Sequence, residues 1–321
     1  MIRLVRIQDI KNKMIVDVII PTYKPDEKFK KLVDMLERQT VPVNKVIVVN
    51  TEEKYMAAFC RGTHFLSEHN NMTMHHISRH EFDHGKSRNF GASKSNADVC
   101  VFMTQDAVPE DEFLIENLLE GLKQENVACA YARQLPDADS TAIEKLTRSF
   151  NYPNRDVIKG QKDIDKLGIK TFFCSNVCCA YDMKIFRELG GFIKKTIFNE
   201  DMIYAGKAIQ NGYNVVYASK ARVIHAHNYT GKQQFKRNFD LGVSQAEHPE
   251  IFANISSESE GIKMVKIVIQ QLREQRQAKE IFPYIYQTGC KFIGYRLGKA
   301  YKKLPRFLIM KCTMSPIYFM K

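Results

Sequence analysis

The sequence lacks any apolar run of the roughly 20 residues that a membrane-spanning helix requires, so we expect no transmembrane segment. Its short basic start, residues 1–13, lacks the charged, apolar and small-residue order of a signal peptide, and we therefore expect a cytoplasmic protein. Internal repeats and low-complexity tracts are missing as well. A chain of 321 residues, 44% of them hydrophobic, can bury one large core, or one domain with an appendage.

The familiar glycine-rich nucleotide loops are also missing. No Gly-x-Gly-x-x-Gly follows the first predicted strand, and no Walker-type Gly-x-x-x-x-Gly-Lys-Ser/Thr loop is present. These absences argue against dinucleotide dehydrogenases and P-loop enzymes. A diphosphate bound by this chain would need another charge partner.

Cysteine pairs at zinc-ligand spacing are missing too. Most of the eight cysteines lie in apolar runs, which is typical of reduced, buried thiols rather than of a disulfide framework. Cys174, Cys178 and Cys179 are close together in the sequence, but no second ligand pair accompanies them. We therefore expect buried thiols here rather than a metal site.

Acidic residues are missing from the last 41 residues. After Glu280 the chain has eight Lys or Arg and no Asp or Glu, which is two-thirds of the net charge of +12. Ile293, Leu297 and Tyr301 recur at helical spacing before Pro305, opposite much of this basic set. Such a basic amphipathic tail, residues 290–321, is typical of an element that binds an anionic membrane surface. A helix packed back on the protein is the alternative; nucleic acid is disfavoured, because no recognised binding module is present.

Apolar strands alternate with helical patterns along the first 231 residues, and the chain is helical beyond. This alternation predicts an α/β fold with a mostly parallel sheet between helices, followed by a second, helical region over residues 232–321. We expect strands at 16–20, 45–49, 74–77 and 99–103, and helices at 28–39, 55–69, 84–97 and 202–210.

Three polar segments follow the first, second and fourth of these strands. They are Pro21-Thr22-Tyr23, Asn50-Thr51 and Thr104-Gln105-Asp106. Because the carboxyl ends of parallel strands meet at one edge of a sheet, we expect the three segments to converge in one crevice, for which a nucleotide is a natural occupant.

The apolar patterns are weaker in the second half of the α/β region. Residues 132–169 are polar and contain many Asp, and we expect a long, partly mobile excursion bordering a binding site. Short strands are expected at 215–217 and 223–224.

Asp106 has two interpretations. It follows the buried strand Val99–Met103, at the place where open α/β sheets bind ligands. A single carboxylate there suits Mg²⁺ or Mn²⁺, which prefer oxygen ligands shared with phosphates. Alternatively, Asp106 caps a helix beginning near Glu110. The identity of Asp106 and its position after the strand are compatible with both the metal-ligand and the helix-cap interpretation.

Four segments occur in order along the chain: Val16-Asp-Val-Ile-Ile-Pro-Thr-Tyr23, Val46-Ile-Val-Val-Asn50, Phe102-Met-Thr-Gln-Asp106 and Asn199-Glu200-Asp201. In these segments and their order, the chain resembles family 2 glycosyltransferases of the GT-A fold, from about Met14 to Gly231. The run His84-Gly-Lys86-Ser-Arg88-Asn89, together with Ser175-Asn-Val177 and His225-Ala-His227, resembles the bacterial rhamnosyltransferase branch.

The resemblance implies a Rossmann-like GT-A domain over residues 1–231, with Asp201 as catalytic base and Glu200 orienting the site. It implies that Asp106 holds Mg²⁺ or Mn²⁺ on the donor diphosphate. Thr104 stands in place of the first Asp of the usual Asp-x-Asp motif, so this motif supplies one carboxylate, that of Asp106, instead of two. His225 or His227 completes the coordination. Because alternate residues of a strand point to opposite faces, we expect only one to serve, and favour His227.

The remaining donor-binding residues follow from the same segments. Lys86 and Arg88 would bind the diphosphate, and Gly85 would let the backbone approach it closely. The alternative interpretation of the run from His84 to Asn89 is a glycine-containing loop followed by the solvent-exposed start of a helix. The full predicted donor set is Pro21, Thr22, Tyr23, Asn50, Thr51, His84, Lys86, Arg88, Asn89, Gln105 and Asp106.

Together, these features predict an inverting, metal-assisted rhamnosyltransferase at the inner face of the cell membrane. The resemblance implies dTDP-rhamnose as donor and a cell-surface polysaccharide or lipid-linked glycan as acceptor. Nothing in the sequence selects the sugar directly, so a UDP-hexose or UDP-N-acetylhexosamine donor stays open. A scaffold that binds sugar nucleotides without catalysis is a further alternative, favoured only by Thr104.

Overall fold

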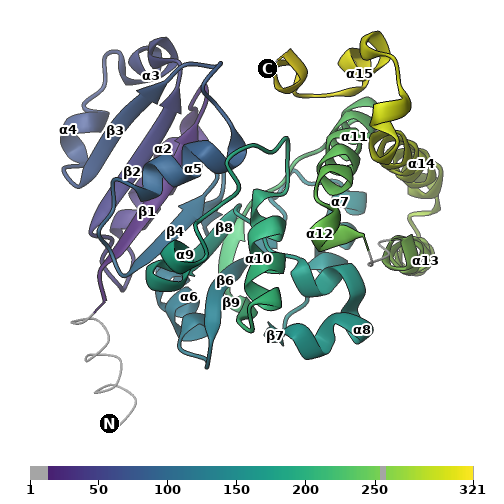
Figure 1. The fold of residues 1–321 in the computed structure, drawn as a ribbon, viewed down its shortest axis with the longest axis horizontal. Helices are drawn as coiled ribbons and strands as arrows, with labels where there is room; N and C mark the ends of the chain where they lie inside the picture. The colour runs from purple at the N-terminus through teal and green to yellow at the C-terminus, as the bar shows by residue number, and fades with distance from the viewer. Residues whose placement is uncertain (1–13, 254–257, 321) are drawn as a thin grey trace.

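A computed structural model of the chain describes residues 14–253 and 258–320. The short basic start and Lys321 of the basic tail lie outside these residues. The described residues form one nine-stranded sheet with helices on both faces, and a group of helices from the C-terminal third stands beside it (Figure 1). This is the α/β architecture expected from the sequence.

The strand order places the segments that follow β1, β2 and β4 at one edge of the sheet. The order is β3-β2-β1-β4-β8-β6-β9-β5, and β7 pairs with β9. The strands β3, β2, β1 and β4 run parallel, as do β6 and β9, whereas β8, β5 and β7 pair in antiparallel fashion. Most paired residues therefore lie in parallel pairs, within a mixed sheet.

The strands are β1 Val16–Thr22, β2 Lys45–Thr51, β3 Met72–Ile77, β4 Val99–Met103, β5 Val108–Pro109, β6 Val127–Leu135, β7 Val157–Lys159, β8 Cys178–Asp182 and β9 Asn214–Ile224. The helices over the first two-thirds are α2 Glu27–Glu37, α3 Glu53–Cys60, α4 Phe65–Glu68, α5 His84–Ala92, α6 Leu114–Leu122, α7 Ala142–Asn151, α8 Ile164–Leu167, α9 Met183–Glu188 and α10 Glu200–Gln210. Those of the C-terminal third are α11 Gly231–Glu247, α12 Pro249–Phe252, α13 Glu258–Glu274, α14 Ile281–Lys299 and α15 Arg306–Cys312.

Local sequence explains the first helix. The Asp26 side chain accepts a hydrogen bond from the Lys28 N–H (3.0 Å) and so caps α2. Phe29, Leu32 and Leu36 then bury one face of the helix against alternate residues of β1 and β2. Residues pointing to the other face of the sheet, such as Ile19, join a second apolar cluster with α10. The central strands are thus apolar on both faces, as the unbroken apolar runs indicated.

The C-terminal helices pack through glycines. Along α11 and α14 the backbones approach so closely that a Cβ added at Gly294 or Gly298 would overlap with the carbonyl oxygen of Phe235 or Phe239. A Cβ at Gly242 would meet the Tyr295 carbonyl oxygen in the same way. Among the described residues, no helix is both long enough and apolar enough to cross a bilayer.

Several expected elements differ from the structure. The helix predicted over 55–69 is broken at Gly62 (φ +72°) into α3 and α4. Residues 132–169, expected as an irregular excursion, contain the end of β6, helix α7, strand β7 and helix α8. The two short strands predicted at 215–217 and 223–224 are parts of β9, whose pairing with β6 shifts register after Ala218.

The basic tail also packs differently from the prediction. Helix α14 ends at Lys299, and Leu297, Tyr301 and Leu304 lie against the buried Phe239 and Val243 of α11. The face that we expected to contact a membrane is therefore largely packed against the protein.

Candidate active site

Two cavities adjoin the carboxyl ends of the parallel strands, and His84 lines both. The large cavity, of about 460 Å³, is bordered by the ends of β4 and β9, by α7, by the segment before β8 and by the start of α10. The small cavity, of about 250 Å³, is bordered by Tyr23, Thr51 and the C-terminal residues Met314–Tyr318. The strand ends thus lie at one edge of the sheet, but they line two cavities that share His84, rather than the single crevice expected from the sequence.

Asp106, His225 and His227 meet in the large cavity. The Asp106 Oδ2 atom lies 3.1 Å from His227 Nε2 and 3.6 Å from His225 Nε2, and the two Nε2 atoms are 3.0 Å apart. One ligand atom of each residue lies within 4.8 Å of the others. The helix after Asp106 begins only at Leu114, so Asp106 does not cap it. The ligand interpretation of Asp106 therefore fits the structure.

The reason for expecting only one histidine ligand, that the two rings point to opposite faces of a strand, does not hold. Strand β9 ends at Ile224, so His225 and His227 belong to the segment that follows it, and alternation across a strand does not apply. Both rings turn towards the carboxylate, and the ring of Tyr229 stacks on His227 with centroids 5.0 Å apart. Both histidines can therefore contribute a nitrogen ligand.

The surroundings favour a cation among these three residues. The Nδ1–H of His225 donates to the Gln134 side-chain oxygen (3.1 Å), which leaves Nε2 free as an acceptor. Burial lowers the pKa of His225 to about 3, so the ring is neutral, as a metal ligand must be. Burial alone would raise the pKa of Asp106, but the hydrogen bond from His227 and the neighbouring imidazoles hold it well below its usual range. A carboxylate and two imidazole nitrogens fit a divalent cation.

Glu200 and Asp201 begin α10 and also line the large cavity. Asn199 precedes them in the left-handed region (φ +65°), which Asn tolerates better than most residues. The Asp201 Oδ2 atom accepts the Asn176 backbone N–H at 2.8 Å, and the Asn176 side chain donates to Glu200 at 3.1 Å. Asn176 therefore fixes both carboxylates.

The two carboxylates have different environments. Glu200 is buried, but the Arg88 guanidinium at 3.1 Å, with His84 and Asn176, outweighs burial and lowers the pKa of Glu200. Burial and the charge of Glu200 raise the pKa of Asp201 well above its usual range. Glu200 is therefore held as an anion, whereas Asp201 has the higher proton affinity that a base requires.

Cations of α11 and α14 also line the large cavity. The Arg237 guanidinium lies 4.6 Å from the Phe198 ring centroid and 5.7 Å from that of Tyr229. Within the described residues, neither Arg237 nor Lys291 has a carboxylate at ion-pair distance, whereas Arg148 is paired with Glu144 at 2.7 Å. Arg237 and Lys291 are thus available to an anionic ligand.

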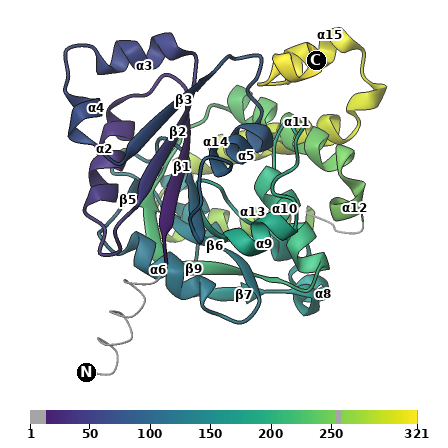
Figure 2. The same cartoon turned by 60° about the vertical axis from the view of Figure 1, so that its left-hand side comes forward.

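The small cavity is closed by the C-terminal segment. Asp240 of α11 accepts hydrogen bonds from the Thr313 hydroxyl (2.6 Å) and the Met314 N–H (3.0 Å). Glu247, at the end of α11, accepts the Tyr318 hydroxyl at 2.6 Å. These contacts hold the end of the chain beside the ends of β1 and β2, where both views show it in yellow (Figures 1 and 2).

The structure brings only part of the predicted donor set to the cavities. Tyr23, Thr51, His84, Arg88 and Asp106 line them, and Arg88 is engaged by Glu200. Lys86 is exposed on the outer side of α5 and lines neither cavity. Gly85 allows a close approach of the Ile193 backbone, rather than of a ligand.

Other members of the predicted set hold the strand ends and loops together. Asn89 exchanges two hydrogen bonds with the Phe192 backbone, and Gln105 does so with the Tyr23 backbone. Thr22 and Asn50 are buried and bonded to each other at 3.1 Å. Pro21, next to Thr22, lines neither cavity.

Several residues of the cavities were not predicted from the sequence. Asn176 was part of a recognised segment, but Arg237, Lys291, Arg79 and the C-terminal wall belonged to no motif. For Lys291 and the C-terminal wall, the only indication in the sequence was the absence of acidic residues from the tail, which suggested an anionic ligand.

Residues 17–190 match the family model described as glycosyl transferase family 2. The chain belongs to this family. The O-antigen chain rhamnosyltransferase RfbN of Salmonella typhimurium is 38% identical over 295 residues, 91% of this chain and 92% of that one. The O-antigen chain rhamnosyltransferase WbaN of Salmonella anatum is 37% identical over 292 residues, 90% of each chain. The resemblance seen in the motifs is thereby confirmed, including its rhamnosyltransferase branch.

A solved structure supports the fold of this glycosyltransferase. The mannosyltransferase PcManGT from Pyrobaculum calidifontis, in complex with GDP-Man and Mn²⁺, superimposes with a TM-score of 0.60 and 14% sequence identity. The match covers 94% of this chain and 93% of that one. The GT-A fold expected from the sequence is therefore confirmed.

Proposed function

We propose that this glycosyltransferase is an inverting rhamnosyltransferase that moves L-rhamnose from dTDP-rhamnose to a hydroxyl of a cell-surface polysaccharide or lipid-linked glycan. The observation that carries the proposal is the large cavity, which is lined both by the Asp106–His225–His227 cluster and by Asp201. The two O-antigen rhamnosyltransferases that match about 90% of the chain favour rhamnose as the sugar.

In the proposed reaction, Asp201 accepts the proton of the acceptor hydroxyl. The acceptor oxygen forms a bond to the anomeric carbon, the bond from that carbon to the diphosphate oxygen breaks, and the diphosphate leaves with the electron pair. A single displacement of this kind inverts the anomeric configuration. Glu200 and Asn176 hold the Asp201 carboxylate in place, because Asn176 bonds both acids.

Asp106, His225 and His227 would hold Mg²⁺ or Mn²⁺. When bound, the ion supplies positive charge to the departing diphosphate. The donor set contains one carboxylate and two imidazoles, which suits Mn²⁺ at least as well as Mg²⁺. Arg237, at the same end of the cavity as Tyr229, would add a second positive charge to the leaving group.

The small cavity would take the nucleoside of the donor. Tyr23 offers an aromatic face there, and Thr51 and Arg79 offer polar groups. His84, which lines both cavities, would stand between nucleoside and sugar. A third cavity of about 290 Å³ shares Thr147, Asn151, Gln234 and Lys291 with the large one and is a route for the acceptor.

Donor turnover tests the proposal. Purified protein with Mn²⁺ or Mg²⁺ should hydrolyse or transfer dTDP-rhamnose in preference to UDP-hexoses and UDP-N-acetylhexosamines. Asp201→Asn should abolish transfer and leave the donor Kd, measured by calorimetry, within about threefold, because the amide cannot accept a proton. If the protein binds UDP-sugars but not dTDP-rhamnose, the donor sugar is not rhamnose. Loss of donor binding in Asp201→Asn would remove Asp201 from the role of base.

A peripheral position at the cytoplasmic face of the membrane is part of the proposal. Phe282, Phe292 and Phe307 of α14 and α15 are 80%, 53% and 61% exposed. Lys302 and Lys303, between these helices, are exposed as well. Exposed aromatic rings beside basic side chains favour adsorption to an anionic lipid surface.

A further inference from the structure

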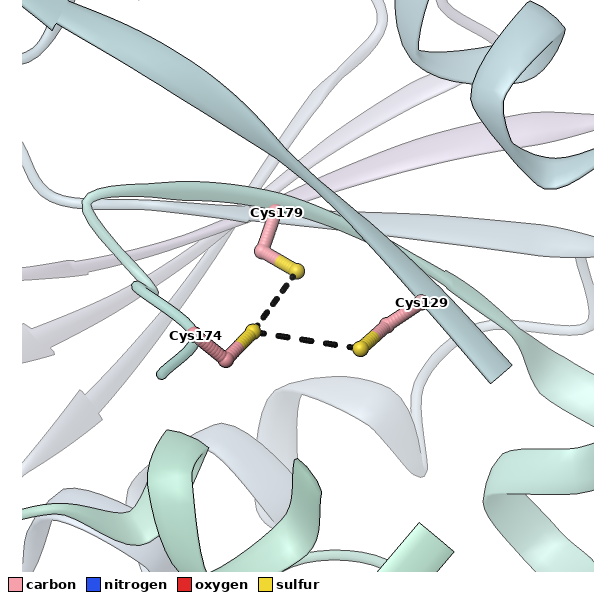
Figure 3. Close-up of side chains that lie close together, drawn as sticks. All are labelled: Cys129, Cys174 and Cys179. Carbon is pink, nitrogen blue, oxygen red and sulfur yellow. Dashed lines mark hydrogen bonds between the residues drawn. The ribbon is translucent and has the colours of Figure 1, made fainter. Parts of the chain in front are cut away.

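Three cysteines meet in the core beneath the catalytic carboxylates. Cys129 belongs to β6, Cys179 to β8, and Cys174 to the segment that precedes β8. The Cys174 sulfur lies 3.5 Å from that of Cys179 and 3.8 Å from that of Cys129 (Figure 3). All three are free and buried, and their sulfur atoms lie within 4.8 Å of one another. The sequence could not bring Cys129 into this group, because 45 residues separate it from Cys174.

The separations suit a shared metal ion. A tetrahedral Zn²⁺ with Zn–S bonds of about 2.3 Å places its sulfur ligands about 3.8 Å apart. The Tyr181 hydroxyl oxygen lies 3.8 Å from the Cys174 sulfur, so a hydroxyl group also adjoins the cluster. Packed thiols make similar contacts, so the charges around the cluster are the stronger argument.

A buried lysine lies beside the cluster. The Lys159 ammonium is 3% exposed, and donates to the Tyr131 hydroxyl at 3.1 Å and to the carbonyl oxygens of Lys170 and Phe173. No carboxylate of the described residues lies at ion-pair distance from it. Burial lowers the pKa of Lys159 to about 8, and negative charge on the neighbouring cysteines acts in the opposite direction. A buried cation of this kind is stabilised by an anionic partner.

We propose that Cys129, Cys174 and Cys179 bind one thiophilic d¹⁰ metal ion as thiolates, with Zn²⁺ as the ion that fits the separations. Three thiolates, one divalent ion and the Lys159 ammonium sum to zero charge, which removes the cost of burying any of them alone. Binding releases the protons of the thiols to solvent. Cu⁺ shares the preference for thiolates and would leave one negative charge.

The proposed ion would fix the loop that holds the catalytic pair. Cys174 is two residues before Asn176, whose backbone and side chain bond Asp201 and Glu200. The Tyr181 hydroxyl, beside the Cys174 sulfur, donates to the Asn176 side-chain oxygen at 2.8 Å. The site would therefore act as a structural support for the carboxylates. It does not depend on which donor the enzyme uses.

Co²⁺ provides the decisive probe. Full-length protein, reduced, depleted of metal and titrated anaerobically with Co²⁺, should develop a sulfur-to-cobalt charge-transfer band whose intensity at saturation corresponds to one thiolate-bound ion per chain. The Asp106–His225–His227 cluster contains no sulfur and cannot produce this band. Cys174→Ala and Cys179→Ala should abolish it. Cys178→Ala is the matched control: Cys178 is equally buried, but its side chain joins the other core cluster, so the band should persist.

Competition by Zn²⁺ and by Cu⁺ then identifies the ion. Zn²⁺ should displace Co²⁺ from the thiolates, and the band should be lost once one equivalent of Zn²⁺ occupies this site. Displacement by Cu⁺ but not by Zn²⁺ would assign the site to Cu⁺. If the alanine variants do not fold, X-ray absorption of the Zn²⁺-loaded wild type decides, with sulfur ligands at about 2.3 Å expected. Absence of the band in folded wild-type protein, or only nitrogen and oxygen ligands on the zinc, would overturn the proposal.

Discussion

At the scale of single residues, the neighbouring acids Glu200 and Asp201 differ because, within the part of the chain that the structure describes, only Glu200 has a cationic partner. Arg88 is committed to Glu200, and Asn176 bonds both acids. Adjacent carboxylates whose environments push their pKa values apart are a common basis for distinct catalytic roles. Arg88, predicted to bind the donor, therefore has a visible task in organising the catalytic wall.

Arg237 is the residue whose substitution should affect the donor most selectively. Removing a charged hydrogen-bond donor from a phosphate typically costs about 1.5–3 kcal/mol, so Arg237→Gln should raise the KM for the donor by roughly tenfold or more. Arg273→Gln, which removes an exposed charge of α13, is the control and should leave KM unchanged. Initial rates at varied donor concentration measure both. Equal KM values for the Arg237 and Arg273 variants would exclude Arg237 from the donor site.

Much of the site was accessible from motifs, but not the direction of individual side chains. Asp106, His225 and His227 were all identified, although a strand was assumed where the chain had already left the sheet. In α5 the motif continues through Lys86, yet helical geometry turns His84 and Arg88, four residues apart, to the cavity and Lys86 to solvent. Arg237 followed no motif, because its role depends on where α11 packs.

At the scale of elements, α11 connects the cavities to the C-terminal third. It contributes Arg237 to the large cavity and Asp240 and Glu247 to the C-terminal segment. Its position depends on the glycine contacts with α14, where no side chain fits between the two backbones.

Gly298 and Gly289 of α14 form a matched pair for testing this packing. A Cβ at Gly298 would overlap with the Phe239 carbonyl oxygen, whereas a Cβ at Gly289 meets nothing within 4 Å. Gly298→Ala should lower the free energy of unfolding by about 1–3 kcal/mol, as overpacking does. Gly289→Ala should raise it by about 0.5–1 kcal/mol, since Gly is unfavourable inside a helix. Urea unfolding checks both, and equal stabilities would contradict the close packing.

The regular βα units were predictable because their apolar patterns are strong. Residues 132–169 were not, because the amphipathic face of α7 is short and packs on α13, more than 100 residues further along the chain. The amphipathic pattern of the tail was detected correctly, but hydrophobic spacing does not say whether a helix faces lipid or protein.

At the scale of the whole molecule, the C-terminal segment crosses from α14 to the ends of β1 and β2. Burial raises the pKa of Asp240, which anchors this segment, to about 6. Since this carboxyl holds its proton more tightly when folded, its contribution to stability is present at low pH and is lost as pH rises through about 6.

Asp240→Asn removes this titration. Wild-type protein should lose about 1 kcal/mol of unfolding free energy relative to the variant between pH 5 and pH 7.5, given a folded pKa near 6. Urea unfolding of both proteins at the two pH values measures the difference. If the difference in unfolding free energy between the two proteins is the same at both pH values, the pKa of Asp240 is not raised.

Membrane association is tested better by point substitutions than by truncation, because removing the tail would also remove a wall of the small cavity. Phe282→Ser, Phe292→Ser and Phe307→Ser together should reduce sedimentation with anionic liposomes severalfold. Lys302→Glu with Lys303→Glu should do the same at low salt. Donor hydrolysis in solution serves as the control and should be unchanged. Undiminished sedimentation of both variants would end the membrane proposal.

The composite wall of the small cavity bears on inhibitor selectivity. Tyr23 and Thr51 belong to the region that matches the family, residues 17–190, whereas Pro316 and Tyr318 lie outside it. A nucleoside analogue that contacts only the first pair would be expected to inhibit family members broadly. A substituent extended towards Pro316 and Tyr318 would instead contact residues outside the shared domain. Such a compound would be expected to bind this enzyme more tightly than relatives with other C-terminal regions.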